Sequence, residues 1–110
     1  MLKTSLLVVG LYAGLVLAAW LGQRKLMYLP DQRRTSPSAV GLVDVTEREL
    51  ATPDGVRLVT WSATARPGRP TILYFHGNAG SLAMRAERVR KFSAAGYGVL
   101  MMAYRGYSGS

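Results

Sequence analysis

The sequence predicts an α/β fold that follows an N-terminal transmembrane helix. Three observations predict it: a long uncharged stretch near the N-terminus, two alternating segments joined by a turn, and two apolar segments on either side of an amphipathic one. They correspond to a membrane helix, a β-hairpin and a β-α-β unit, the last two forming a mixed, mostly parallel sheet. With 110 residues, the chain holds at most one small domain.

The uncharged segment is residues 5–22, SLLVVGLYAGLVLAAWLG. As a helix it comes close to the thickness of the bilayer's hydrocarbon core. Lys3 precedes it, and Arg24 and Lys25 follow it. We expect residues 1–25 to be an uncleaved, single-pass signal-anchor. A cleaved signal peptide is the alternative, although the segment lacks an Ala-x-Ala site and exceeds the usual length of a signal's apolar region.

Charge favours the membrane as a partner. Lys and Arg outnumber Asp and Glu by 14 to 6, for a net charge of +8, which could suit nucleic acid or an anionic membrane surface. Arg24, Lys25, Arg33 and Arg34 lie just after the apolar segment, where they can bind headgroups. The chain has no basic stripe with interleaved aromatic residues, so we expect no nucleic-acid binding. The positive-inside rule favours a cytoplasmic C-terminal part.

Residues 26–42 contain two prolines and consist of an apolar patch, 26–30, followed by a polar segment without a clear period, which predicts a linker before a domain over residues 43–110. Two strands, 43–51 and 56–63, alternate apolar and polar residues. The turn Thr52-Pro53-Asp54-Gly55 separates them, so they predict an antiparallel hairpin.

The β-α-β unit begins with the apolar segment Thr71–Phe75, a predicted strand buried on both faces. We expect Ser81 to cap the following helix and Gly96 to end it. The buried stripe of this helix is expected to contain Leu82, Ala86, Val89 and Phe92. Gly98–Ala103 is a second apolar strand, which should lie parallel to the first.

Between the first of these strands and the helix lies FHGNAG, which contains the single histidine, His76. The spacing fits neither a Walker A loop nor a dinucleotide fingerprint. One histidine with no cysteine and no nearby carboxylate cluster predicts no metal site, and it cannot complete a Ser-His-Asp triad within this chain. The remaining interpretation uses backbone N–H groups, which a sharp glycine turn directs into a cleft to stabilise an oxyanion.

These residues resemble the α/β-hydrolase superfamily. The similarity rests on FHGNAG at 75–80, YRGYSGS at 104–110, Q-R-K-L-x-Y-x-P at 23–30 and T-P-D-G-x-x-L at 52–58. It is strongest to the membrane-anchored, bud-emergence-type hydrolases grouped with serine aminopeptidase-like domains. The resemblance implies an incomplete α/β-hydrolase fold, of which this chain is the N-terminal portion.

The resemblance also implies an esterase, lipase or peptidase-like hydrolase with a Ser-His-Asp triad and no cofactor. The backbone N–H of Asn78 would be the first oxyanion-hole donor. The supporting residues of its loop would be His76, Gly77, Ala79 and Gly80. By the same resemblance Arg105 and Gly106 stabilise the next turn, and Ala103 stands where many relatives carry Asp.

The G-x-S-x-G nucleophile elbow is expected beyond residue 110, because Ser108 is followed by Gly109-Ser110 and lies one β-α unit too early. We therefore expect no nucleophile, acid or base in this chain and no activity from it alone. A non-catalytic membrane-tethered interaction protein and a basic lipid-headgroup binder remain alternatives. The acyl substrate, small molecule or peptide, stays open.

Overall fold

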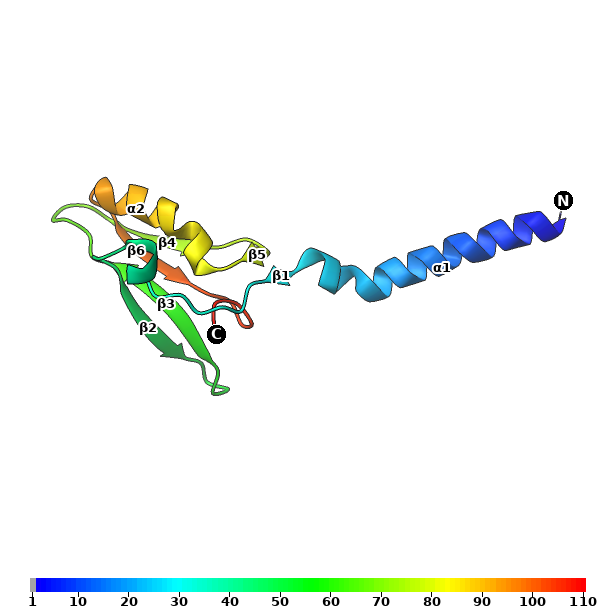
Figure 1. Ribbon diagram of the computed structural model, residues 1–110, viewed down its shortest axis with the longest axis horizontal. Helices are drawn as coiled ribbons and strands as arrows, with labels where there is room; N and C mark the ends of the chain where they lie inside the picture. Colours follow the sequence, from blue (N-terminus) through cyan, green and yellow to red (C-terminus); the bar gives the residue numbers. More distant parts are fainter. Residues whose placement is uncertain (1) are drawn as a thin grey trace.

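The computed structural model describes residues 2–110 (Figure 1). The helical elements are α1 (Leu2–Met27), η1 (Ser38–Val40), η2 (Leu82–Arg85) and α2 (Ala86–Ala94). The strands are β1 (Leu29–Pro30), β2 (Thr46–Ala51), β3 (Arg57–Ala63), β4 (Thr71–Phe75), β5 (Ala79–Gly80) and β6 (Gly98–Met102).

Helix α1 extends away from the rest of the molecule (Figure 1). The whole molecule, α1 included, measures 74 × 31 × 25 Å. None of the described residues of α1 is buried, although most are apolar. Helix α1 is long and apolar enough to cross a membrane. A signal sequence near the N-terminus meets the same criteria of length and composition. The helix continues beyond the predicted segment 5–22 at both ends, because the flanking residues also favour helix.

The main sheet has the strand order β2-β3-β6-β4. Strands β2 and β3 form the predicted antiparallel hairpin, with Thr46 opposite Ser62 and Ala51 opposite Arg57. Strand β6 pairs antiparallel with β3 and parallel with β4. The predicted β-α-β unit in a mixed sheet is therefore confirmed, and the hairpin joins it through the β3–β6 pair.

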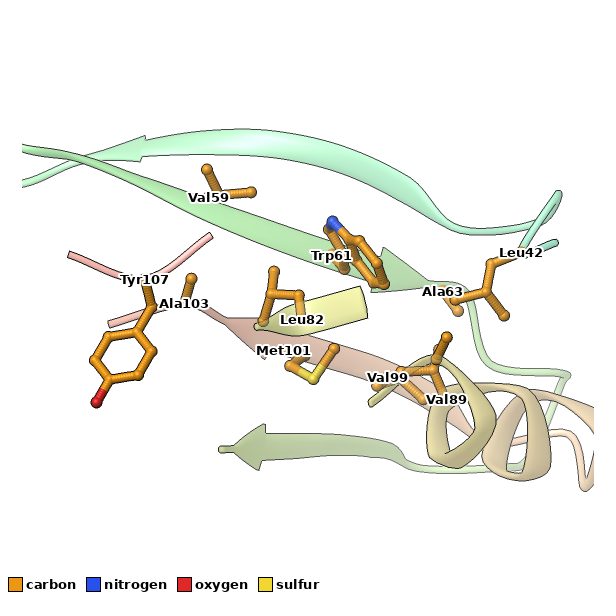
Figure 2. Close-up of a cluster of buried hydrophobic side chains, with 11 residues drawn as sticks. Leu42, Val59, Trp61, Ala63, Leu82, Val89, Val99, Met101, Ala103 and Tyr107 are labelled. Carbon is orange, nitrogen blue, oxygen red and sulfur yellow. The ribbon is translucent and has the colours of Figure 1, made fainter. Parts of the chain in front are cut away.

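The core lies between the sheet and α2. Val59, Trp61 and Ala63 of β3 and Val99 and Met101 of β6 point to this face, as Figure 2 shows. The buried positions of the helical segment are Leu82, Ala86 and Val89, with Phe92 partly buried, as predicted. Gly96, with φ of 86°, ends the helix as expected.

Strand β4 is not buried on both faces, contrary to the prediction. It is an edge strand, and Leu73 and Phe75 are 58% and 53% exposed. Helix α2 covers only one side of the sheet, so the opposite side carries apolar side chains open to solvent. These side chains are Leu50, Leu73, Phe75 and Leu100.

Ser81 occupies the predicted N-cap position, with the extended backbone that is usual there, but its side chain makes no capping hydrogen bond. The hydroxyl of Ser108 instead accepts a hydrogen bond from the Leu82 N–H, at 2.8 Å, which satisfies this helical donor from a distant loop.

Residues 26–42, the predicted linker, pack against the domain over part of their length. Strand β1 pairs parallel with β5, so that Leu29 lies opposite Ala79 and Pro30 opposite Gly80 (Figure 1). Leu42 enters the core. Each of these strands is only two residues long, too short for a periodic signal, which is why the sequence did not reveal the pairing.

Candidate active site

Two loops meet at the carboxyl ends of the parallel strands. Residues 76–78 follow β4, and residues 103–110 follow β6. Because β4 and β6 are parallel neighbours, these loops leave the same edge of the sheet. Open α/β sheets bind their ligands at this edge.

His76 joins the two loops. Its side chain is buried, and Nε2 accepts a hydrogen bond from the Tyr104 N–H at 3.1 Å. Nδ1 must then carry the proton, which it donates to the Gly77 carbonyl at 2.8 Å. The ring centroid lies 4.3 Å from that of Tyr104 and 4.9 Å from that of Tyr107. Both ring nitrogens are thus occupied by backbone groups, an arrangement that suits positioning the loops rather than transferring a proton.

The backbone carbonyl of Asn78 accepts two hydrogen bonds, whereas its backbone N–H has no partner within residues 2–110. Its carbonyl accepts from the Leu29 N–H at 3.0 Å and from the Tyr107 hydroxyl at 2.6 Å. Within residues 2–110, its own N–H makes no hydrogen bond. A backbone donor without an internal partner needs water or a ligand, so this N–H can bind an anionic oxygen.

The rest of the loop has distinct structural roles. Gly80 has φ of 86°, a left-handed conformation that favours glycine; a Cβ there would also meet the exposed, flexible Met84 side chain. Gly77 has space for a Cβ. The Ala79 carbonyl accepts a hydrogen bond from the Arg85 side chain at 2.9 Å.

Ser108 is buried in the second loop, with φ of 53°. Its N–H donates to the Asp31 carbonyl at 2.8 Å, and its hydroxyl accepts from Leu82. Ser110 Oγ accepts from the Val59 N–H at 2.8 Å. Both hydroxyls hold the loop to its neighbours, which gives Ser108 a structural contact where the sequence predicted only a loop residue.

Arg105 links the second loop to the hairpin turn, and Gly106 next to it has φ of 79°. The Arg105 guanidinium donates to both carboxylate oxygens of Asp54, at 2.5 and 2.8 Å. These hydrogen bonds, with a further one from Thr52, lower the pKa of Asp54 from 3.8 to about 2. The charge of Arg105 is therefore already paired. Ala103, two residues before Arg105, is fully buried in the core.

An open cavity of about 750 Å³ lies at this edge of the sheet. It has the size typical of small-molecule sites. Its lining includes Asn78 and the end of α1; the residues are Arg24, Tyr28, Pro30, Leu58, Asn78, Met102, Tyr104, Arg105 and Tyr107. Tyr28, Leu58 and Tyr107 were not predicted as site residues, because they come from segments far apart in the sequence; the pairing of β1 with β5 brings the segment of Tyr28 to this edge. Residues 2–110 contain no group of three or more His, Cys, Asp or Glu that could hold a metal ion.

Comparison with known proteins gives the family. No family model matches the chain. The chain is 36% identical over 96 residues to the alpha/beta hydrolase domain-containing protein WAV2 of Arabidopsis thaliana, covering 80% of this chain and 31% of that protein. It is 41% identical over 66 residues to the protein bem46 of Schizosaccharomyces pombe, covering 56% and 22%. The chain belongs to the α/β-hydrolase superfamily, as a bud-emergence-type member.

Two further comparisons give an uncharacterized relative and a similar fold. The chain is 34% identical over 100 residues to the uncharacterized protein Rv2307c of Mycobacterium tuberculosis, covering 89% of this chain and 36% of that protein. The fold is similar to that of an esterase of Pyrococcus furiosus, with a TM-score of 0.50 and 20% identity over 74% of this α/β-hydrolase chain and 32% of the esterase. The chain thus spans about a third or less of the length of these three curated relatives.

Proposed function

We propose that this chain is the N-terminal part of a membrane-anchored serine hydrolase, in which it supplies one half of the oxyanion hole. The observation that carries the proposal is the Asn78 N–H, which has no acceptor within residues 2–110 and belongs to a residue that lines the cavity at the carboxyl edge of the sheet. During acyl transfer the carbonyl oxygen of an ester, thioester or amide becomes negatively charged. A fixed N–H directed at that oxygen stabilises the charge without reorganising.

The proposal assigns the nucleophile, base and acid to residues that follow position 110 in the natural protein. His76, the single histidine of this sequence, has both ring nitrogens engaged with backbone groups. The relatives extend well beyond the matched region, which leaves room for a triad. A nucleophile elbow also supplies the second oxyanion donor, from the N–H after the serine.

We also propose that α1 anchors the enzyme in the bilayer, with the catalytic domain on the cytoplasmic side. Its apolar length and the basic residues Arg24 and Lys25 in its last turn support this. The intact mass of the membrane-extracted protein tests it, since a product beginning near residue 20 means that the helix is a cleaved signal.

The oxyanion role is tested with two substitutions in the full-length gene product. Asn78→Pro removes the backbone N–H, whereas Asn78→Ala keeps it. We expect Asn78→Pro to lower kcat for a p-nitrophenyl ester about 10²–10³-fold more than Asn78→Ala does. Circular dichroism must show that both variants are folded. Equal kcat in the two folded variants rejects the N–H as a donor.

Reading the coding sequence beyond codon 110 supplies an independent test. A G-x-S-x-G motif in a strand-to-helix turn, followed by Asp and then His, supports the hydrolase. A stop codon supports instead a membrane-tethered protein without catalysis.

A further inference from the structure

We propose that the cavity beside Asn78 binds the acyl chain of an anionic phospholipid that enters from the bilayer. As a statement about the substrate class, this inference rests on the proposed hydrolase function. As a statement about binding, it rests on the cavity alone.

The cavity lies next to the end of the proposed membrane helix. Arg24 lies in the last turn of α1 and Tyr28 just after it, and both line the same cavity as Asn78. If α1 spans a bilayer, its basic last turn lies at headgroup level. The cavity therefore begins where lipid headgroups lie and reaches the proposed oxyanion donor.

Most of the cavity lining is apolar. Leu58, Met102, Tyr104 and Tyr107 provide aliphatic and aromatic surface. The aromatic rings are fixed, because those of Tyr104 and Tyr107 pack on His76 and against each other, with centroids 6.2 Å apart. A preformed apolar surface of this kind suits an extended hydrocarbon chain better than a polar peptide.

The charged side chains of the cavity lining are both basic. Two arginines line the cavity, but Arg105 is paired with Asp54 through two hydrogen bonds. Arg24 forms no ion pair with any carboxylate of residues 2–110. One free cation at the membrane end of an apolar cavity is complementary to a lipid phosphate whose acyl chain extends inward.

The occupant is therefore predicted to place its phosphate at Arg24 and its acyl chain over Leu58 and Met102. The ester that connects the two parts would then lie in the cavity with Asn78. Such a substrate would react as an acyl ester of a membrane lipid, and the bilayer itself would supply it.

Photocrosslinking tests this inference in the 110-residue chain, without any need for catalysis. The chain is placed in phosphatidylcholine nanodiscs that contain a trace of phosphatidylglycerol or phosphatidylcholine with a diazirine in the acyl chain. Crosslinked residues are located by mass spectrometry. We expect crosslinks to Leu58, Met102 or Tyr104 as well as to α1, about fivefold more with the anionic probe, the effect of one basic residue at an anionic surface.

Arg24→Gln should remove this preference for the anionic probe at the cavity residues. Lys25→Gln is the matched control, since it removes the same charge one residue away at a position that does not line the cavity. The inference is wrong if crosslinks are confined to α1, if wild type does not distinguish the probes, or if Lys25→Gln loses as much preference as Arg24→Gln.

The outcome is separable from that of the hydrolase proposal. Cavity crosslinks together with equal kcat for the two Asn78 variants would retain lipid binding and reject the oxyanion role. Crosslinks confined to α1 together with a large loss in Asn78→Pro would retain the hydrolase and reject the phospholipid substrate.

Discussion

The Oγ atom of Ser108 accepts a hydrogen bond from the backbone N–H of Leu82 across 26 positions of sequence, at 2.8 Å. Both residues are buried. This bond holds the loop after β6 against the start of η2, and the Ser108 N–H donates to Asp31 in the segment that follows β1. Three separate segments therefore meet at one serine.

Ser108→Ala should destabilise the fold, because it leaves the buried Leu82 N–H without an acceptor. We expect the free energy of unfolding to fall by about 1–3 kcal/mol. Urea unfolding in detergent micelles, followed by the fluorescence of buried Trp61, measures it. Ser38→Ala is the control, since the exposed Ser38 hydroxyl contacts only the exposed Ser36, and it should change stability by less than about 0.5 kcal/mol.

A serine-directed fluorophosphonate probe should not label the 110-residue chain. Ser108 is only 3% exposed and its hydroxyl is engaged with Leu82, while the Ser110 hydroxyl accepts from Val59. Neither serine has a base beside it, since both nitrogens of His76 bind backbone groups. Active-site labelling detected by mass spectrometry at either position would contradict this assignment.

Gly80→Ala should disturb the loop, because an L-residue is strained at φ of 86°. We expect a loss of about 1–3 kcal/mol in unfolding free energy. Gly77→Ala is the matched comparison in the same loop, where a Cβ meets no atom within 4 Å. Equal losses for the two variants in urea unfolding would show that backbone strain at Gly80 is unimportant.

The ion pair between Asp54 and Arg105 predicts a dependence of stability on pH. The pKa of Asp54 falls from 3.8 to about 2 in the folded chain, mainly through hydrogen bonds from Arg105 and then from Thr52. A lowered carboxyl pKa stabilises the fold above pH 3.8, and this contribution is lost as the pH falls through about 2.

Asp54→Asn should therefore flatten the decline in thermal midpoint between about pH 4 and pH 2. Added salt should weaken the same contribution, because the pair is exposed. Asp44→Asn serves as the control, since Asp44 is exposed and no hydrogen bond or ion pair joins its side chain to the described residues. A decline that is unchanged in Asp54→Asn would exclude the pair as its cause.

Local sequence patterns predicted the hairpin, the β-α-β unit and the buried stripe of Leu82, Ala86 and Val89. They also located the loop with Asn78. They failed for β4, because the apolar residues of Thr71–Phe75 favour burial on both faces while α2 covers only one face of this edge strand. They placed Ser81 at the N-cap, but its side chain makes no hydrogen bond there, and the Leu82 N–H finds its acceptor in the distant Ser108.

The sequence by itself determined the apolar length of α1, the order of β2, β3, β4, α2 and β6, and the glycine loop after β4, because periodicity and turn chemistry act between near neighbours. Only the tertiary structure decided that β1 pairs with β5, that His76 contacts Tyr104, and that Arg24 shares a cavity with Asn78. Each of these contacts joins segments that are far apart in the sequence. They form only when folding brings unpaired backbone groups and side chains together, which the local composition of each segment does not indicate.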